Sequence, residues 1–323
     1  MRCKMKLLTG VLSVLLLASV TSTVFAQGRA VNEQRDIPAT ASVNIENMRG
    51  DLKVIGSDRS TAEVTGTLDE KAEGFTMEMR GNTLFIKVEM PRNVDWRGER
   101  DEGSNLVVRL PQSVGVSVSG VSTDVEITNI HGGTQVTSVS GDLTARNLQG
   151  NIRLNTVSGD VTSRQLAGDI AVETVSGDID DRDASGTAIS YQSVSGDVLA
   201  ITSIKTVNAQ TVSGDIELDL KTIESLTLKN VSGDANVGLQ LQPNSRLEAT
   251  SVSGDLRLTF AGDLDAQFEL AANAGGDIIN RITDRRAEKA KYGPARSLDF
   301  RVGEGSSTVK MNTVSGDIEV RKN

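Results

Sequence analysis

The chain has little of what most often carries catalysis, metal binding or cross-linking. Its 323 residues include one cysteine, Cys3, and one histidine, His131, and only 3% are aromatic. A Ser-His-Asp triad would depend on His131 alone, and a histidine-based metal site would lack a second histidine. With so few aromatics, the core has to be built from Val, Ile and Leu, which suits thin, repetitive β layers. These residue types indicate no cofactor.

The N-terminus has the features of a secretory signal peptide. Basic residues precede a mostly apolar stretch from 7 to 20, and small residues follow around a cleavage site after Ala26. Cys3 lies before the apolar stretch, so it is not a lipoprotein cysteine, and the processed chain has no cysteine. No second long apolar run follows. We therefore expect an exported protein, periplasmic or extracellular, without a transmembrane segment in its mature form.

Acidic residues are in excess once residues 1–26 are removed. The remaining chain has 31 basic and 43 acidic residues, a net charge near −12. Such a chain repels nucleic acid unless it has a strong local basic patch.

A four-residue motif recurs along most of the chain. Val-Ser-Gly-Asp occurs eight times, and a degenerate Val-Ser-Thr-Asp ends at Asp124. From Asp124 to Asp255 the steps are 18, 18, 18, 19, 18, 19 and 21 residues, which ordinary loops do not produce. The gap between Asp255 and the last motif, at Asp317, divides into steps close to the same period if Asp277 and Asp299 also mark corners.

Each unit also has a second, fainter corner about eight or nine residues from the first, as in "LQGNIRL" and "LAGDIAV". Alternating apolar and polar residues around it indicate half-buried strands. A unit this short cannot bury its apolar face alone and must stack on its neighbours. The sequence therefore predicts an all-β fold, a β-solenoid of about 18-residue coils with two short strands each. The solenoid spans 116–323, and an irregular N-terminal β cap spans 27–115.

The corner residues have structural reasons to recur. Glycine permits a positive φ, and Ser and Asp side chains accept hydrogen bonds from nearby backbone N–H groups. We expect the valine of the motif to point inward. Stacked aspartates repel each other by roughly 0.9 kcal/mol per pair in water, which capping hydrogen bonds of about 1 kcal/mol offset. The alternative interpretation is a Ca²⁺-binding ladder, as in β-rolls with Gly-rich, Asp-containing repeats. Its ligands would be Asp142, Asp160, Asp178, Asp197, Asp215 and Asp234.

Two basic features are candidate interaction surfaces for an envelope glycan, an anionic surface or a protein partner. One is a ladder of arginines, each four residues after the aspartate of its coil: Arg146, Arg164 and Arg182. The other is a basic insertion at 281–296, for which we expect a loop with a helical turn at "RRAEKAKY". Its candidate contacts are Arg285, Arg286, Lys289 and Lys291.

Two other short stretches indicate turns rather than sites. The acidic "DIDDRD", residues 178–183, predicts a solvated turn. Arg49-Gly50-Asp51 has the letters of an integrin motif, but "MRGDLKV" fits the corner pattern and predicts a degenerate turn. The pattern breaks at a polar loop around Trp96, residues 93–105, where a site could lie.

The repeated "TVSGDI" and "SVSGDV", the early "SVNIENMRGDLKVIG" and the closing "VKMNTVSGDIEV" resemble the bacterial DUF4097 family of β-strand-repeat proteins. The resemblance covers about 40–323. It implies a secreted or envelope-associated β-solenoid and carries the label of an adhesin, with no catalytic or ligand residues to assign.

These observations favour a non-catalytic structural or adhesin-like interaction module. The remaining alternative is a polysaccharide-active enzyme using paired carboxylates, since acidic side chains are abundant. They recur at the same corner of every coil, however, whereas a catalytic pair is a local exception.

Overall fold

The computed structural model describes residues 29–91 and 103–323. The predicted signal peptide and Trp96 lie outside this part of the chain. The prediction of an all-β fold is confirmed, since every element of the described residues is a strand. No helix of the described part is long and apolar enough to cross a membrane.

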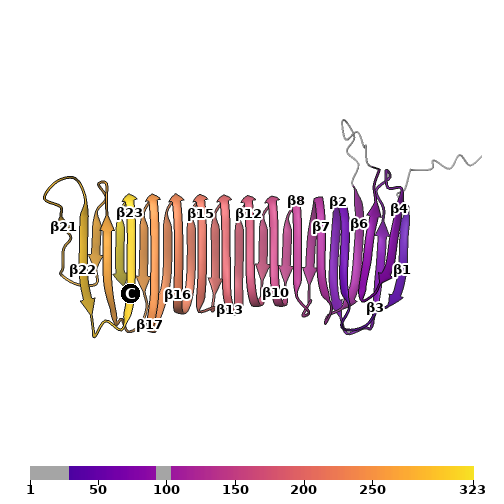
Figure 1. The fold of residues 1–323 in the computed structure, drawn as a ribbon, viewed down its shortest axis with the longest axis horizontal. Helices are drawn as coiled ribbons and strands as arrows, with labels where there is room; N and C mark the ends of the chain where they lie inside the picture. The colour runs from indigo at the N-terminus through magenta and orange to yellow at the C-terminus, as the bar shows by residue number, and fades with distance from the viewer. Residues whose placement is uncertain (1–28, 92–102) are drawn as a thin grey trace, which may run out of the picture.

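The strands form a long stack with two walls joined by tight corners (Figure 1). The first wall contains β8 (Thr134–Ser140), β10 (Gln149–Ser158), β12 (Ala167–Ser176), β15 (Thr206–Ser213) and β23 (Ser307–Ser315). The second wall contains β9 (Leu143–Arg146), β11 (Val161–Arg164), β14 (Val198–Thr202), β18 (Leu256–Phe260) and β24 (Ile318–Lys322). Five longer strands bend through a corner and join both walls: β2 (Ser42–Ser57), β7 (Gly115–Thr128), β13 (Ile179–Ser195), β16 (Ile216–Ser232) and β17 (Ala235–Ser253).

Neighbouring strands in each wall are parallel, and those in the middle of the stack pair residues one repeat apart. Ile152 of β10 lies opposite Ile170 of β12, and Val161 of β11 lies opposite Ile179 of β13. Similar aliphatic side chains thus stack along the inner face of each wall, and the backbone of each of these strands is hydrogen-bonded on both edges. This is a β-solenoid-like arrangement, in which each turn of chain is held by the turns beside it.

Both ends of the stack are closed by antiparallel strands. At the N-terminal end these involve β1 (Ala30–Asp36), β3 (Thr61–Thr67), β4 (Gly74–Arg80), β5 (Thr83–Glu89) and β6 (Ser104–Pro111). β3 pairs with β1 and β6, and β4 pairs with β5. At the C-terminal end they involve β19 (Ala266–Ala272), β21 (Glu288–Lys289) and β22 (Arg296–Val302), whereas β20 (Ile278–Arg281) pairs in parallel with β24. Antiparallel ends limit the exposed parallel edge that would otherwise template aggregation.

The order of the C-terminal coils differs from the predicted order. β23 pairs in parallel with both β17 and β19, so the last strands of the chain lie inside the stack (Figure 1). Asp317 therefore follows Asp255 in space, and Asp277 follows Asp317. The corner expected at Asp299 is wrong, because Asp299 lies in β22, antiparallel to β19 and opposite Glu269. In this part of the chain, sequence spacing locates the corner of a coil but does not show which coil lies next to it.

Aliphatic side chains fill the space between the walls. Every second residue of a strand points inward, as in β12, where Ile170 and Val172 are buried. Three of the few aromatics gather at the C-terminal end, where the Phe268 ring stacks on Phe300 at 4.4 Å and meets Phe260 edge-on at 5.6 Å.

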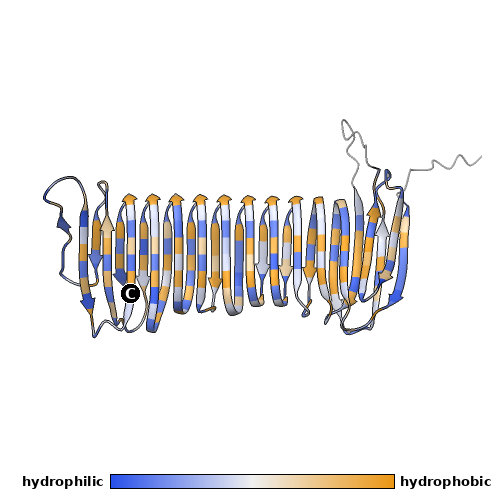
Figure 2. Ribbon diagram, in the orientation of Figure 1, coloured by the Kyte–Doolittle hydropathy of each residue, from blue (hydrophilic) through white to orange (hydrophobic). Residues whose placement is uncertain are grey.

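The prediction that the valine of each motif points inward is wrong. These valines lie at the outer surface of the corner and are 39–47% exposed, and Met48 occupies the same position in β2 at 43%. Figure 2 shows the hydrophobic tips of successive first-wall strands aligned along one edge of the stack. In each Val-Ser-Gly-Asp motif the residue before the valine is the buried one, because alternation along a strand allows only one of two neighbours to face the core. We call this surface row the valine ladder: Val121, Val139, Val157, Val175, Val194, Val212, Val231, Val252 and Val314.

The two corners of each coil use different residues. At the motif corner the glycines lie so close to the coil before them that a Cβ would overlap its backbone: a Cβ added to Gly196 would lie 2.0 Å from the Gly177 carbonyl oxygen. At the other corner Gly168 has a φ of 136°, and Gln165, three residues earlier, is left-handed at 56°. The sequence pattern revealed the glycines, whereas the left-handed residue before them has no fixed type.

Candidate functional site

The aspartates of the motif form a continuous ladder of hydrogen bonds. One carboxylate oxygen of each aspartate accepts the backbone N–H of the aspartate in the next coil, as between Asp197 and the Asp215 N–H at 2.8 Å. Nine such bonds, each of 2.7–3.0 Å, link Asp124 to Asp277 through the described corners. Each bond satisfies a corner N–H that the tight turn removes from the strand ladder.

This geometry assigns the aspartates a structural task, and the second oxygens of Asp234 and Asp255 are further bound by Arg257. Among the described residues no group of three or more Asp, Glu, His or Cys side chains is arranged to hold a metal ion. Calcium takes six to eight oxygen ligands. A single row of carboxylates, each with one oxygen already in a hydrogen bond, supplies few oxygen ligands at any one point.

We expect Asp197→Ala to lower the free energy of unfolding by about 1 kcal/mol, because the Asp215 N–H loses its acceptor. Asp197→Asn should change the free energy by less than about 0.5 kcal/mol, since the amide oxygen still accepts and one charge leaves the ladder. Urea unfolding of both variants, with and without millimolar Ca²⁺, measures this. A large saturable rise of the wild-type melting temperature with Ca²⁺, absent in both variants, would contradict the structural role.

The three arginines of the predicted ladder lie in register on the outer face of the second wall. Arg146 pairs with Arg164, and Arg164 with Arg182, along β9, β11 and β13. Their charges are balanced by carboxylates: Arg164 makes a two-pronged contact with Asp180 at 2.9 and 3.1 Å, and Arg182 contacts the same carboxylate at 3.1 Å.

The hydrogen bonds from Arg164 hold the pKa of the Asp180 carboxyl below its ordinary value, and the same contact raises the pKa of Arg164. Arg146 lies 3.6 Å from Glu126. A partner would have to compete with these contacts, so the arginine ladder is a weak candidate for binding.

A buried polar cluster lies where a solvated turn was expected, and that prediction is wrong. Asp181 belongs to β13 and has no exposed surface. It accepts hydrogen bonds from the hydroxyls of Ser163, at 2.5 Å, and Tyr191, at 2.7 Å. Burial raises the pKa of the Asp181 carboxyl, and burial together with the nearby carboxylate raises the pKa of Tyr191 well above its ordinary value. The cluster has no access to substrate, so it is structural.

The basic insertion is an ordered, exposed hairpin at the C-terminal end of the stack. β21 pairs antiparallel with β22, and the Ala290 N–H donates to the Ala295 carbonyl at 2.9 Å, so the expected helical turn is wrong. The side chain of Asn280 shapes its first turn by accepting from the N–H of Ile282 at 3.0 Å. Tyr292 is 82% exposed at the tip.

The cations of this hairpin fall into two groups. Arg281 binds Glu319 at 2.6 Å and Arg296 binds Asp277, so both anchor the hairpin to the stack. The other four are exposed, and none of them forms a salt bridge within the described part of the chain: Arg285, Arg286, Lys289 and Lys291. The Lys291 ammonium lies 5.3 Å from the centre of the Tyr292 ring, which orients it without neutralising it.

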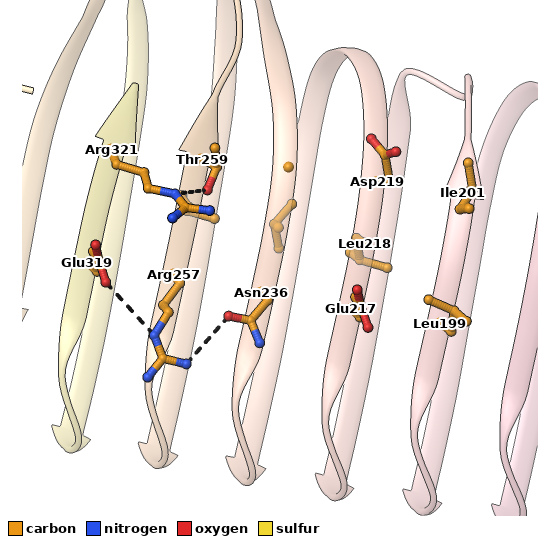
Figure 3. Close-up of a pocket in the computed structure, with 13 residues that line it drawn as sticks. Leu199, Ile201, Glu217, Leu218, Asp219, Asn236, Arg257, Thr259, Glu319 and Arg321 are labelled. Atoms are coloured by element: carbon orange, nitrogen blue, oxygen red, sulfur yellow. Dashed lines mark hydrogen bonds and ion pairs between the residues drawn. The ribbon is translucent and has the colours of Figure 1, made fainter. Parts of the chain in front are cut away.

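A shallow hollow of about 400 Å³ lies on the outer face of the second wall, and sequence reasoning missed it (Figure 3). Gly238 leaves the space that a side chain would fill. Glu217 and Asp219 lie on one side, and Arg257 lies on the other. The Arg257 guanidinium is occupied by Asp234, Asp255 and Asn236, with Glu319 at 4.0 Å. These contacts tie neighbouring coils together and leave no catalytic constellation.

The histidine also lacks catalytic partners. The Nε2 atom of His131 is buried and makes no hydrogen bond within the described residues. A general base needs a hydrogen-bonded nucleophile, and Nε2 has none within the described residues.

Comparison with known proteins gives one family. The profile of the family described as Toastrack DUF4097 matches residues 40–321, close to the range of the resemblance in the sequence. A search among curated proteins found no match.

Several solved structures are similar over most of the chain. A "putative lipid binding protein" from Parabacteroides distasonis has 14% identity and a TM-score of 0.40, covering 91% of this chain and 98% of its own. A "putative adhesin" from Bacteroides fragilis has 12% identity and a TM-score of 0.35, covering 90% and 97%. A "putative adhesin" from P. distasonis has 13% identity and a TM-score of 0.42, covering 72% and 94%. These similarities are too distant to carry an argument about function.

Proposed function

Because the chain belongs to the Toastrack DUF4097 family, we propose that it is an exported, non-catalytic β-solenoid of about 18-residue coils that acts as an adhesin-like interaction module of the cell envelope. The features that resemble an export signal are in residues 1–26, with cleavage after Ala26. The stack supplies a stiff scaffold, because its motif corners are bonded to the next coil. Its partner is an anionic envelope component, a glycan or a protein, held by the basic hairpin.

The observation that carries this proposal is the unbalanced charge of the hairpin. The chain as a whole is acidic, and many cations of the described residues lie beside carboxylates, as Arg164, Arg257 and Arg281 do. What distinguishes the hairpin is clustering: four exposed cations without a salt bridge in the described residues lie within 285–291, beside an exposed tyrosine. Repulsion within an exposed cluster of unpaired cations lowers the stability of the folded state. The same cluster attracts an anionic partner and contributes to the free energy of binding.

We expect the fourfold variant Arg285→Glu, Arg286→Glu, Lys289→Glu, Lys291→Glu to lose binding to its envelope partner by at least about 10-fold. A pull-down from envelope extract and a glycan array, each run at rising salt, measure this. Wild-type binding should fall with ionic strength, because exposed charges are screened.

The matched control reverses four exposed cations outside the hairpin: Arg35, Lys205, Lys221 and Lys322. It changes the net charge equally and should retain binding. If both variants lose binding equally, the loss reflects overall charge and not the hairpin. If both variants bind as well as the wild type, the hairpin is not the contact.

A further inference from the structure

The valine ladder is an apolar row on a surface that is otherwise polar. All nine valines and Met48 are 39–47% exposed, and they follow one another at every motif corner from β2 to β23. The residue two positions earlier, also on the outer face of the first wall, is polar in every coil. In chain order these residues are Glu46, Ser119, Thr137, Asn155, Glu173, Gln192, Gln210, Lys229, Thr250 and Asn312. We call them the polar row.

The fold alone does not require valine at this position. An extended residue before a turn favours β-branching, which threonine provides with a hydroxyl for the solvent. The polar row varies freely, whereas the exposed corner position is apolar in each described motif. An uninterrupted exposed apolar row along a whole molecule marks an interaction surface.

The size of the row fits contact with a second rod. At about 45% exposure a valine leaves roughly 60 Å² in contact with water, so the row exposes on the order of 600 Å² of apolar surface. A standard interface takes about 800 Å² from each partner, and the polar row beside the valines supplies the remainder. A partner that covers the whole row has to be as long and as regular as the row, and another copy of this chain has the same repeat.

A groove beside the ladder supplies a place for a partner's valines. It has a volume of about 570 Å³ and lies between the valine ladder and the polar row, with buried hydroxyl residues as its floor. Val175, Val194 and Val212 form one side, and Gln192 and Gln210 form the other. We propose that two copies of this chain associate side by side and parallel, each placing its valine ladder in this groove of the other.

Symmetry and charge select the parallel arrangement. The chain passes from the polar row through the valine to the aspartate, so the aspartate ladder and the polar row lie on opposite sides of the valines. A two-fold axis parallel to the rods places the aspartate ladder of one copy against the polar row of the other, and lets both ladders enter grooves reciprocally. A two-fold axis across the rods places valine on valine and aspartate ladder on aspartate ladder, which like-charge repulsion disfavours.

The first experiment measures the mass of the full chain in solution by light scattering and sedimentation equilibrium. We expect a dimer at micromolar concentration. The variant Val175→Thr, Val194→Thr, Val212→Thr, Val231→Thr keeps β-branching and should raise the dissociation constant by at least about 100-fold. The control Leu199→Thr, Ile201→Thr removes half-buried apolar surface from the outer face of the second wall and should leave the dimer unchanged.

The second experiment tests the arrangement without relying on those variants. In a Cys3→Ala background, Val139→Cys and Val314→Cys place single cysteines near opposite ends of the ladder. A parallel dimer brings each cysteine near its own counterpart, so both variants should form interchain disulfides on oxidation. A monomer at high concentration, a dimer insensitive to the threonine variant, or cross-linking confined to a central cysteine such as Val194→Cys would each overturn the proposal.

Discussion

Replacing Gly196 with alanine should lower the free energy of unfolding by about 4 kcal/mol, among the largest effects of any single methyl group in this protein. The added Cβ would lie 2.0 Å from the carbonyl oxygen and 2.6 Å from the carbonyl carbon of Gly177 in the adjacent coil. Neither atom can move without breaking the hydrogen bonds of its own corner. The φ of 150° at Gly196 is also one that residues with a side chain rarely adopt.

The matched control for this prediction is Gly238→Ala, in β17 of the same stack. A Cβ there would meet its nearest atom at 3.9 Å, and no left-handed φ is required. We expect a change of less than about 1 kcal/mol, on the stabilising side, because alanine restricts the unfolded chain more than glycine does. Urea unfolding followed by circular dichroism measures both variants. Equal stability of the two alanine variants would show that the corner glycines are not required by close contact between coils.

The second large effect is expected at Asp181. Asp181→Ala should lower the free energy of unfolding by about 3 kcal/mol, because the buried hydroxyls of Ser163 and Tyr191 both lose their acceptor and a cavity forms. Asp181→Asn should stay within about 1 kcal/mol of wild type near neutral pH. Its amide can accept from one hydroxyl and donate to the other, and it needs no buried charge.

The pH dependence has a definite sign. Burial raises the folded pKa of Asp181 above its unfolded value of about 3.9, so the folded state binds the proton more tightly. The contribution of Asp181 to stability is therefore greatest below the unfolded pKa and is lost as pH rises through the folded pKa. We expect Asp181→Asn to become more stable relative to wild type over this window, and melting temperatures between pH 3 and pH 8 test it. A difference that stays constant across the window would contradict a raised pKa.

Much of the fold follows from the period of the sequence. A repeat of about 18 residues cannot bury its own apolar face, so the units must stack, and the spacing of the aspartates places them in one row. The glycines of both corners were visible for the same reason, since each recurs at a fixed place in the repeat. These features are local, and each coil repeats them.

The orientation of the valines could not be obtained from the period. A one-residue change in where the strand meets the corner exchanges its inward and outward faces, and both Val175 and its neighbour Thr174 are β-branched. Only packing shows that Thr174 is buried and Val175 exposed, because the close approach of the corner glycines fixes the direction of the residues before them. The prediction that Asp181 lies in a solvated turn was wrong for a related reason. Three nearby aspartates made the segment look exposed throughout, although the side chain of Asp181 points inward.

The sequence by itself determined that this is an all-β protein of stacked coils with an aspartate row at one corner. The tertiary structure alone decided which coils are neighbours at the two ends of the stack, whereas the coils from Asp124 to Asp255 follow one another in sequence order. β2 lies against β7, although most of the N-terminal antiparallel strands separate them in the chain, and β23 lies between β17 and β19. A parallel edge accepts any strand with matching alternation and a glycine at the corner, so the repeat cannot encode the order. That order follows from how the antiparallel strands close each end of the stack.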